Sequence, residues 1–147
     1  MALDIPEGVS TNGTVAAIFI ETMLNFNVPK LTEINAGSSL DLSCYLSELE
    51  TDATENTIED PRLCARQVFE APGDFSNSLG LTYVFNPGEP TENEAMLALP
   101  RGTTGFIVIR WAIDAEEPFA IGDIVDVYKV RMGFQKKVNP TRNAMHR

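Results

Sequence analysis

Residues 28–46 of the chain are VPKLTEINAGSSLDLSCYL, and the second half of this stretch shows the clearest alternation in the sequence. Successive side chains of a β-strand point to opposite faces, so a period of two indicates one buried and one hydrated face. Residues 39–46 follow this period, and they predict a strand whose buried side chains are Leu40, Leu42, Cys44 and Leu46. Residues 31–36 predict one helical turn, which Thr32 caps and Gly37 ends.

Further strands are predicted on both sides of this stretch. Segments rich in β-branched, aromatic and other apolar residues are typical of strands, and they occupy residues 14–20, 63–70, 79–85, 105–111 and 121–132. Turn residues at 71–74 and 86–88 separate some of these segments. One helix is predicted over residues 91–99, because a capping-box pattern precedes it and Pro100 stops it.

The predicted fold class is mainly β, a β-sandwich or barrel of about six to eight strands with one α-helix and extended arms. A chain of 147 residues has the size of one domain, and no repeat or linker divides it. We expect a single domain over residues 1–147. Its arms are an N-terminal arm at residues 1–12 and a C-terminal arm at 133–147, and residues 47–61 are expected to form a long acidic loop.

Charge is distributed unevenly along the chain, whose net charge is −10. Residues 1–100 carry −13 and residues 101–147 carry +3, and no acidic residue follows Asp126. An acidic body repels nucleic acid, whereas a basic tail can dock on an acidic surface. The alternative interpretation is a solvated acidic face and a frayed basic terminus.

The composition is that of a soluble globular protein, with 44 % hydrophobic and 22 % charged residues. The longest apolar run, residues 15–20, is too short to cross a bilayer, and no signal peptide is recognisable at the N-terminus. A cytoplasm-like compartment is therefore expected. Cys44 and Cys64 are predicted to be reduced core thiols, although a disulfide between them is also compatible with the sequence.

No set of catalytic, cofactor-binding or metal-binding residues is recognisable. The only histidine is His146 beside the C-terminus, and the Walker A, dinucleotide-binding and zinc patterns are absent. Nucleophilic catalysis needs a serine or cysteine beside a base, and the sequence indicates no such pair. Trp111 is interpreted as an inward residue of an alternating strand and not as a base-stacking platform. We expect no enzyme and no cofactor.

Residues 28–46 resemble a segment near the N-terminus of major tail proteins from siphophages of actinobacteria. The matching positions are Pro29, Glu33, Ile34, Ala36, Gly37, Leu42, Cys44, Tyr45 and Leu46. Later segments resemble the same family in order and spacing: DPRLC at 60–64, LPRG at 99–102, GFIVIR at 105–110 and DIVDVYKV at 123–130. The resemblance covers roughly residues 10–135. One departure is Lys30, where the family segment often has threonine.

The resemblance implies a structural virion protein of the phage tail, whose hexameric rings stack into the tube. Its implied partners are further copies of itself, the tape-measure protein and the terminator and distal tail proteins, and double-stranded DNA passes through the lumen. Assembly is expected in the host cytoplasm, without a membrane. The candidate subunit-interface residues are the loop acids and tail cations Glu48, Glu50, Asp52, Glu55, Lys136, Lys137, Arg142 and Arg147.

Two alternatives remain open in the sequence. The first is another phage structural protein with a related fold, such as a tail terminator, connector or capsid decoration protein. The second, from a different class, is a small β-barrel enzyme or binding module. Rings that never stack would indicate a terminator, and a defined monomer with a deep polar pocket would indicate the enzyme or binding module.

Overall fold

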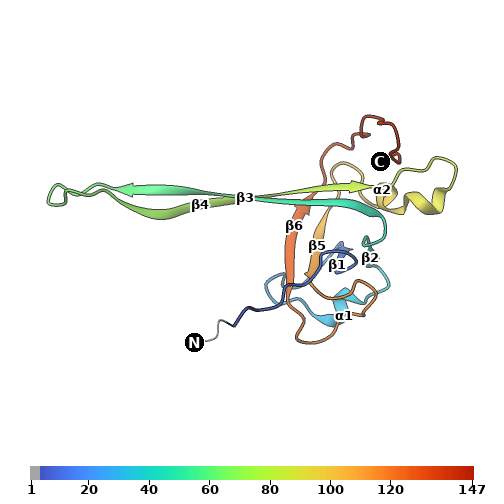
Figure 1. The fold of residues 1–147 in the computed structure, drawn as a ribbon, viewed down its shortest axis with the longest axis horizontal. Coiled ribbons are helices and arrows are strands. Elements are labelled where there is room, and N and C mark those ends of the chain that lie inside the picture. Colours follow the sequence, from blue (N-terminus) through green and yellow to red (C-terminus); the bar gives the residue numbers. More distant parts are fainter. Residues whose placement is uncertain (1–3) are drawn as a thin grey trace. The chain divides into compact units, whose positions relative to one another are not determined.

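The computed structural model describes residues 4–147. These residues form six strands in two antiparallel sheets, together with two short α-helices (Figure 1). The predicted mainly β fold class is confirmed, and the arrangement is consistent with a β-sandwich. The chain divides into two compact units, one built from residues up to 46 and from 83 onward, the other from residues 47–82. The expectation of a single domain stays a prediction.

The first unit is organised by a four-stranded sheet in the order β2-β1-β5-β6. Its strands are β1 (Val15–Ile20), β2 (Leu40–Asp41), β5 (Thr104–Trp111) and β6 (Val125–Arg131). In the antiparallel pair β1 and β5, Ile18 lies opposite Val108 and Phe19 opposite Ile107. These two strands are central in the sheet, which explains why their sequences are apolar at nearly every position.

Both faces of the two central strands are buried. On one face, Ile18, Ile20 and Val108 form a cluster with Ile34 of the helix α1 (Leu31–Ile34). Because side chains alternate along a strand, Phe19 and Ile107 point to the opposite face, where they are also buried. The core of the first unit therefore has a layer on each side of its sheet.

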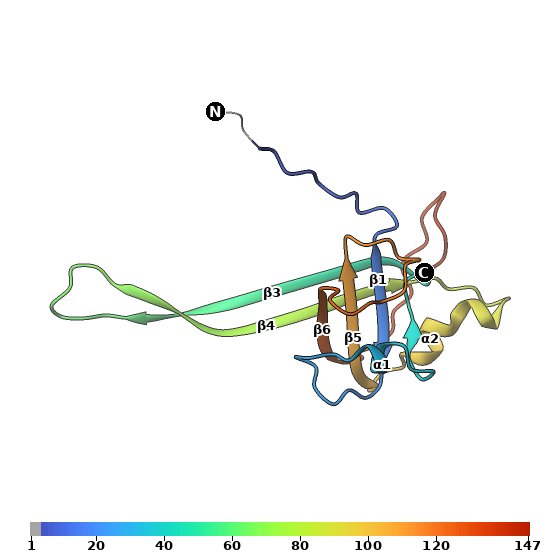
Figure 2. The same ribbon diagram turned by 90° about the horizontal axis from the view of Figure 1, so that it is seen from below.

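The second unit is a two-stranded hairpin of β3 (Leu46–Asp60) and β4 (Phe69–Tyr83), which run side by side in Figure 2. The predicted acidic loop at 47–61 is therefore wrong, because nearly all of it is strand. Most of its side chains are exposed on both faces, so no apolar alternation marked it as a strand. The turn between the strands lies at residues 61–68, and the predicted turn at 71–74 belongs to β4.

The stretch at 39–46 forms a shorter strand than predicted. Only Leu40–Asp41 pairs with β1, because the Asp41 carboxylate accepts the Ser43 amide at 2.9 Å and the chain turns there. The Ser43 hydroxyl then accepts the Ala17 amide at 3.0 Å, where the next residues of a strand would have paired. Cys44 is exposed as a result. Cys64, in the turn between β3 and β4, is exposed as well, so the prediction of core thiols is wrong.

The helices also differ from the prediction in detail. Helix α1 begins after Lys30, and Thr32 lies inside it, so Thr32 is not the cap. The predicted helix at 91–99 consists of a 3-10 turn, η1 (Pro90–Asn93), followed by α2 (Glu94–Ala98). The described residues thus contain a short α-helix, α1, where one helical turn was predicted, and a second, α2, where the helix was predicted.

Candidate assembly surfaces

The acidic interface candidates lie on the hairpin. Glu48, Glu50, Asp52 and Glu55 are all exposed residues of β3. Since strand residues alternate, Glu50 and Asp52 point to one face and Glu55 to the other. The ion pairs found in residues 4–147 are Arg62–Asp60 and Arg110–Asp123, so these four carboxylates carry uncompensated charge.

The basic candidates lie in the C-terminal segment of the first unit. Lys136, Lys137, Arg142 and Arg147 are exposed, and none takes part in an ion pair of the described residues. The structure therefore does not bring the acidic and basic candidates together in an ion pair. Their proposed meeting in an interface stays a prediction.

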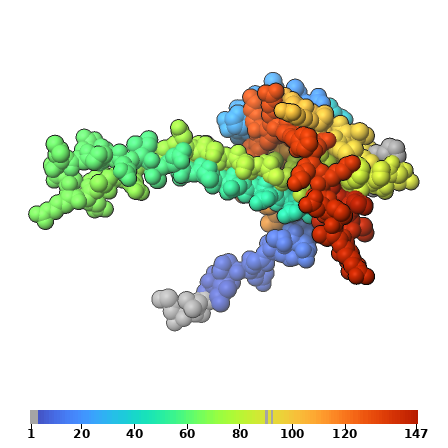
Figure 3. Space-filling view, turned by 90° about the horizontal axis from the view of Figure 1, so that it is seen from above, coloured from blue at the N-terminus to red at the C-terminus, as the bar shows by residue number. Residues whose placement is uncertain are grey.

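The C-terminal segment, red in Figure 3, is anchored on its own unit by four contacts. The Phe85 amide donates to the His146 carbonyl at 3.2 Å, and the Lys137 ammonium lies 4.8 Å from the centre of the Phe85 ring. The side-chain amide of Gln135 donates to the backbone carbonyls of Met96 and Leu99 at 3.0 and 2.8 Å. These carbonyls lie at the C-terminal end of α2, where backbone acceptors lack helical partners. A segment expected to be an arm thus caps a helix.

The N-terminal arm forms no helix or strand before Val15 in the described residues, and residues 4–12 are exposed. Residues 1–3 of that arm lie outside the described residues. An assembly role for the arm stays a prediction.

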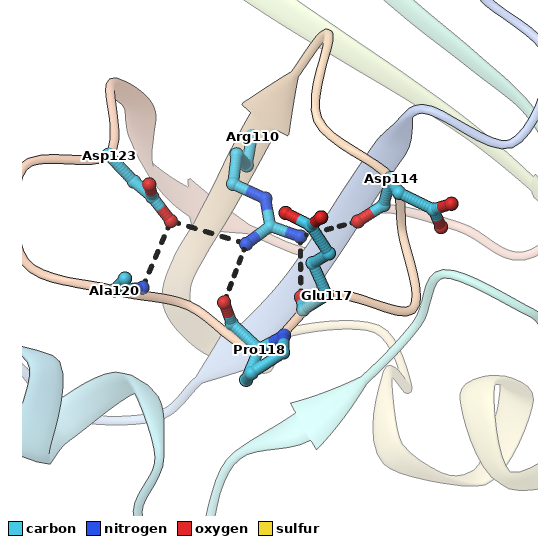
Figure 4. A network of polar contacts seen from close by, with 6 residues as sticks. All are labelled: Arg110, Asp114, Glu117, Pro118, Ala120 and Asp123. Carbon is cyan, nitrogen blue, oxygen red and sulfur yellow. Dashed lines mark hydrogen bonds and ion pairs between the residues drawn. The ribbon is translucent and has the colours of Figure 1, made fainter.

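Arg110, the last residue of the GFIVIR segment that resembles the family, is the one fully buried charged side chain of the described residues, and its burial was not predicted. Its guanidinium donates to the carbonyls of Asp114, Glu117 and Pro118 at 2.7–3.2 Å and to the Asp123 carboxylate at 3.2 Å (Figure 4). It also lies over the Phe119 ring, 4.4 Å from its centre. Burial of a charge is tolerated only with such partners, so Arg110 fixes the path of residues 112–124.

Trp111 occupies the opposite face of β5 from Arg110. Its side chain is 41 % exposed, and its indole N–H donates to the Asp126 carboxylate at 2.7 Å. The interpretation of Trp111 as an inward residue is therefore wrong, because Trp111 is the last residue of β5, where the burial of the strand ends. Apart from the run GFIVIR itself, no sequence pattern marked the arginine at the end of this apolar strand as buried.

A small pocket lies between the segment at α1 and the loop that Arg110 holds. Its volume is about 130 Å³, and it is lined by Pro29, Leu31, Ile34, Phe119, Ala120, Ile121, Gly122, Asp123 and Val125. Sites for small-molecule ligands usually have 300–1,000 Å³, so this pocket has room for about one side chain. Among the described residues, no group of three or more histidine, cysteine or acidic side chains could hold a metal ion. No helix in residues 4–147 is long and apolar enough to cross a membrane.

Comparison with known proteins gives one family. A search of curated proteins found no match to the chain. The family model described as phage tail tube protein matches residues 2–147, which is nearly the whole sequence. This match confirms the recognition of a tail tube protein, while the actinobacteriophage type stays a prediction. The chain belongs to the phage tail tube protein family, and it is a structural protein of the virion tail that self-assembles there.

Proposed function

We propose that the chain forms hexameric rings, which stack into a tube around the tape-measure protein and conduct double-stranded DNA to the host. The observation that carries this proposal is the family match over residues 2–147. The tube is completed by the terminator and distal tail proteins, and its subunits assemble in the host cytoplasm. The role is structural, and catalysis is not part of the proposal.

The charge of the chain supports DNA passage. A lumen that conducts DNA must not bind phosphate, because each lysine or arginine contact adds affinity and friction. The chain carries 21 acidic and 11 basic residues, and most of the acids face solvent. We infer that carboxylates line the lumen and keep the DNA mobile.

The uncompensated charges support a contact between copies. The C-terminal cations of one copy are proposed to meet Glu48, Glu50, Asp52 and Glu55 of a neighbour in the same or the next ring. Each group is exposed and lacks an ion-pair partner in the described part of its own chain. Ring stacking is a head-to-tail contact that continues until something caps it, and opposite charges on two different surfaces favour such a contact.

Negative-stain microscopy of the concentrated protein tests the assembly. We expect rings that stack into tubes, and persistent monomers at high concentration would contradict the proposal. Rings that never stack would indicate a tail terminator instead.

Charge reversal tests the polar contact. The double variant Lys136→Glu with Arg142→Glu should raise the protein concentration that is needed for tubes to form. Adding Glu50→Lys and Asp52→Lys to this double variant should partly restore assembly. Arg101→Glu is the matched control, since this exposed cation lies outside the tail. Equal effects of the tail variant and the control would overturn the charge contact, while leaving tube formation itself intact.

A further inference from the structure

Asn12 is the only asparagine of the sequence that is followed by glycine, and it lies with Gly13 in an exposed turn just before β1. Gly13 has a φ of 70°, in the left-handed region that favours glycine. Beyond the chain neighbours of Gly13, nothing lies within 4 Å of a Cβ built on it. The peptide bond between Asn12 and Gly13 is therefore open to water on the surface of the first unit.

Hydrogen bonds hold the backbone on both sides of this peptide bond but leave its reactive groups free. The Asn12 backbone N–H donates to the Ser10 hydroxyl at 3.3 Å, and the Gly13 carbonyl accepts from the Ala115 N–H at 2.8 Å. Within residues 4–147, no hydrogen bond engages the side-chain amide of Asn12 or the N–H of Gly13. The side-chain carbon Cγ of Asn12 and the backbone nitrogen of Gly13 are thus an electrophile and a nucleophile that are both free to react.

Asn27 provides a comparison within the same chain. It is exposed, and its backbone N–H donates to a side-chain oxygen two positions back, the Oδ1 of Asn25 at 3.0 Å, in the same way as that of Asn12. The residue that follows is Val28, whose branched side chain crowds its own backbone nitrogen. The Val28 N–H also donates to the Asn25 carbonyl at 3.2 Å. Attack by the following nitrogen is therefore hindered at Asn27 and unhindered at Asn12.

We propose that Asn12 is a site of spontaneous covalent modification, in which the backbone nitrogen of Gly13 attacks the Asn12 Cγ. The new N–Cγ bond closes a succinimide ring, and the side-chain nitrogen leaves as ammonia with the proton of the Gly13 N–H. Water then opens the ring at either of its carbonyls. Opening at Cγ gives aspartate, whereas opening at the main-chain carbonyl gives isoaspartate, in which the chain runs through the former side chain. Both products carry a carboxylate in place of the neutral amide, which is why asparagine is a labile residue.

Isoaspartate also alters the joint between the N-terminal arm and the sheet. It inserts an extra carbon into the main chain directly before Gly13, whose carbonyl accepts from the Ala115 N–H, and β1 begins shortly after it at Val15. The extra atom displaces the Gly13 carbonyl from its donor, so the bond to Ala115 is weakened. Aspartate leaves the main chain unchanged and keeps this bond.

Mass spectrometry of the full chain after incubation at mildly alkaline pH tests the modification. Cleavage after glutamate gives the peptide 8–21, whose only asparagine is Asn12, and the peptide 22–33, which contains Asn25 and Asn27. The first peptide should gain about one mass unit and become a methyl acceptor for an isoaspartyl methyltransferase, while the second stays unchanged over the same time. Asn12→Gln should abolish the gain, because the longer side chain must close a larger ring.

Incubation in urea shows whether the fold leaves the site open. The native protein should react at Asn12 as fast as the unfolded chain, since the exposed turn gives no protection. An unchanged peptide 8–21, equal gains in the two peptides, or a native protein that is protected relative to the unfolded chain would overturn the proposal.

Hydrogen exchange at Ala115 tests the change at the joint. The Ala115 amide should exchange faster in the isoaspartate form than in the wild type, because it loses its acceptor. Asn12→Asp is the matched control, since it adds the charge without the extra main-chain atom, and it should exchange as the wild type does. Equal exchange in all three proteins would overturn the weakening of the bond to Gly13. None of these measurements depends on tube assembly.

Discussion

Phe19 of β1 packs over Gly105 at the start of β5, so closely that a Cβ at position 105 would lie 2.6 Å from the ring carbon Cε2. The same Cβ would lie 2.8 Å from the backbone carbonyl oxygen of Ile20. Real Cβ atoms do not approach other atoms this closely. The ring can therefore pack onto the sheet only because position 105 has no side chain.

Gly105→Ala should lower the free energy of unfolding by about 1–3 kcal/mol, because the added methyl forces the Phe19 ring and the neighbouring backbone apart. Urea unfolding followed by circular dichroism measures the loss. Gly37→Ala is the matched control, since nothing lies within 4 Å of a Cβ built there. If both variants lose the same stability, the close contact is not the cause.

Arg110→Met should lower the free energy of unfolding by about 3–5 kcal/mol, because it leaves three main-chain carbonyls and the Asp123 carboxylate without their buried donor. Asp123→Asn should cost less, since the amide oxygen still accepts from Arg110 and the three carbonyl bonds remain. Denaturant unfolding compares the two. A larger loss for Asp123→Asn would show that the ion pair outweighs the carbonyl bonds.

Gln135→Ala should lower the free energy of unfolding by about 1–2 kcal/mol, because the carbonyls of Met96 and Leu99 lose a shared donor. Hydrogen exchange of the α2 amides should become faster in this variant. Lys136→Ala provides the comparison, because this neighbouring side chain is exposed. Unchanged exchange at α2 would mean that the C-terminal segment does not stabilise the helix.

Tyr83 gives the protein a pH dependence in the alkaline range. Burial raises the pKa of the Tyr83 phenol above its ordinary value near 10, and a hydrogen bond with Gln135 lowers it in part. The folded state therefore holds this proton more tightly than the unfolded state does. The resulting stability is complete below pH 10 and is lost as the pH rises through the pKa of the folded protein.

Tyr83→Phe removes this titration. Unfolding measured from pH 8 to pH 11 should show a steeper loss of stability in the wild type than in the variant. Parallel curves would contradict the assignment of the effect to Tyr83, because all other titrating groups are shared.

The sequence predicted the central sheet well, and the reason is packing on both faces. Strands β1, β5 and β6 were expected close to their observed bounds, because runs of apolar and β-branched residues are typical of strands buried in a sheet. The hairpin strand β3 was missed because its stability does not come from a buried face. Its Thr54 bonds to Ser76, 22 positions away, and such a pairing leaves no local pattern.

The candidate sites were predicted only in part. The charged candidates could be named because runs of one charge are visible in a sequence, but the partners that we propose for them belong to other copies. The burial of Arg110 was not predicted because arginine is usually exposed, and only the three-dimensional path of the loop supplies its acceptors. The small pocket was equally hidden, since Ile34 and Ile121, which both line it, are distant in sequence.

The bonds of Arg110 also have a consequence for how this loop can vary. Three of its four acceptors are main-chain carbonyls, which any amino acid provides. Arg110 thus holds the course of residues 112–124 mainly through main-chain acceptors, and the side chains of Ala115 and Glu116 take part in none of its bonds. Substitutions at positions 115 and 116 should therefore leave the course of the loop unchanged.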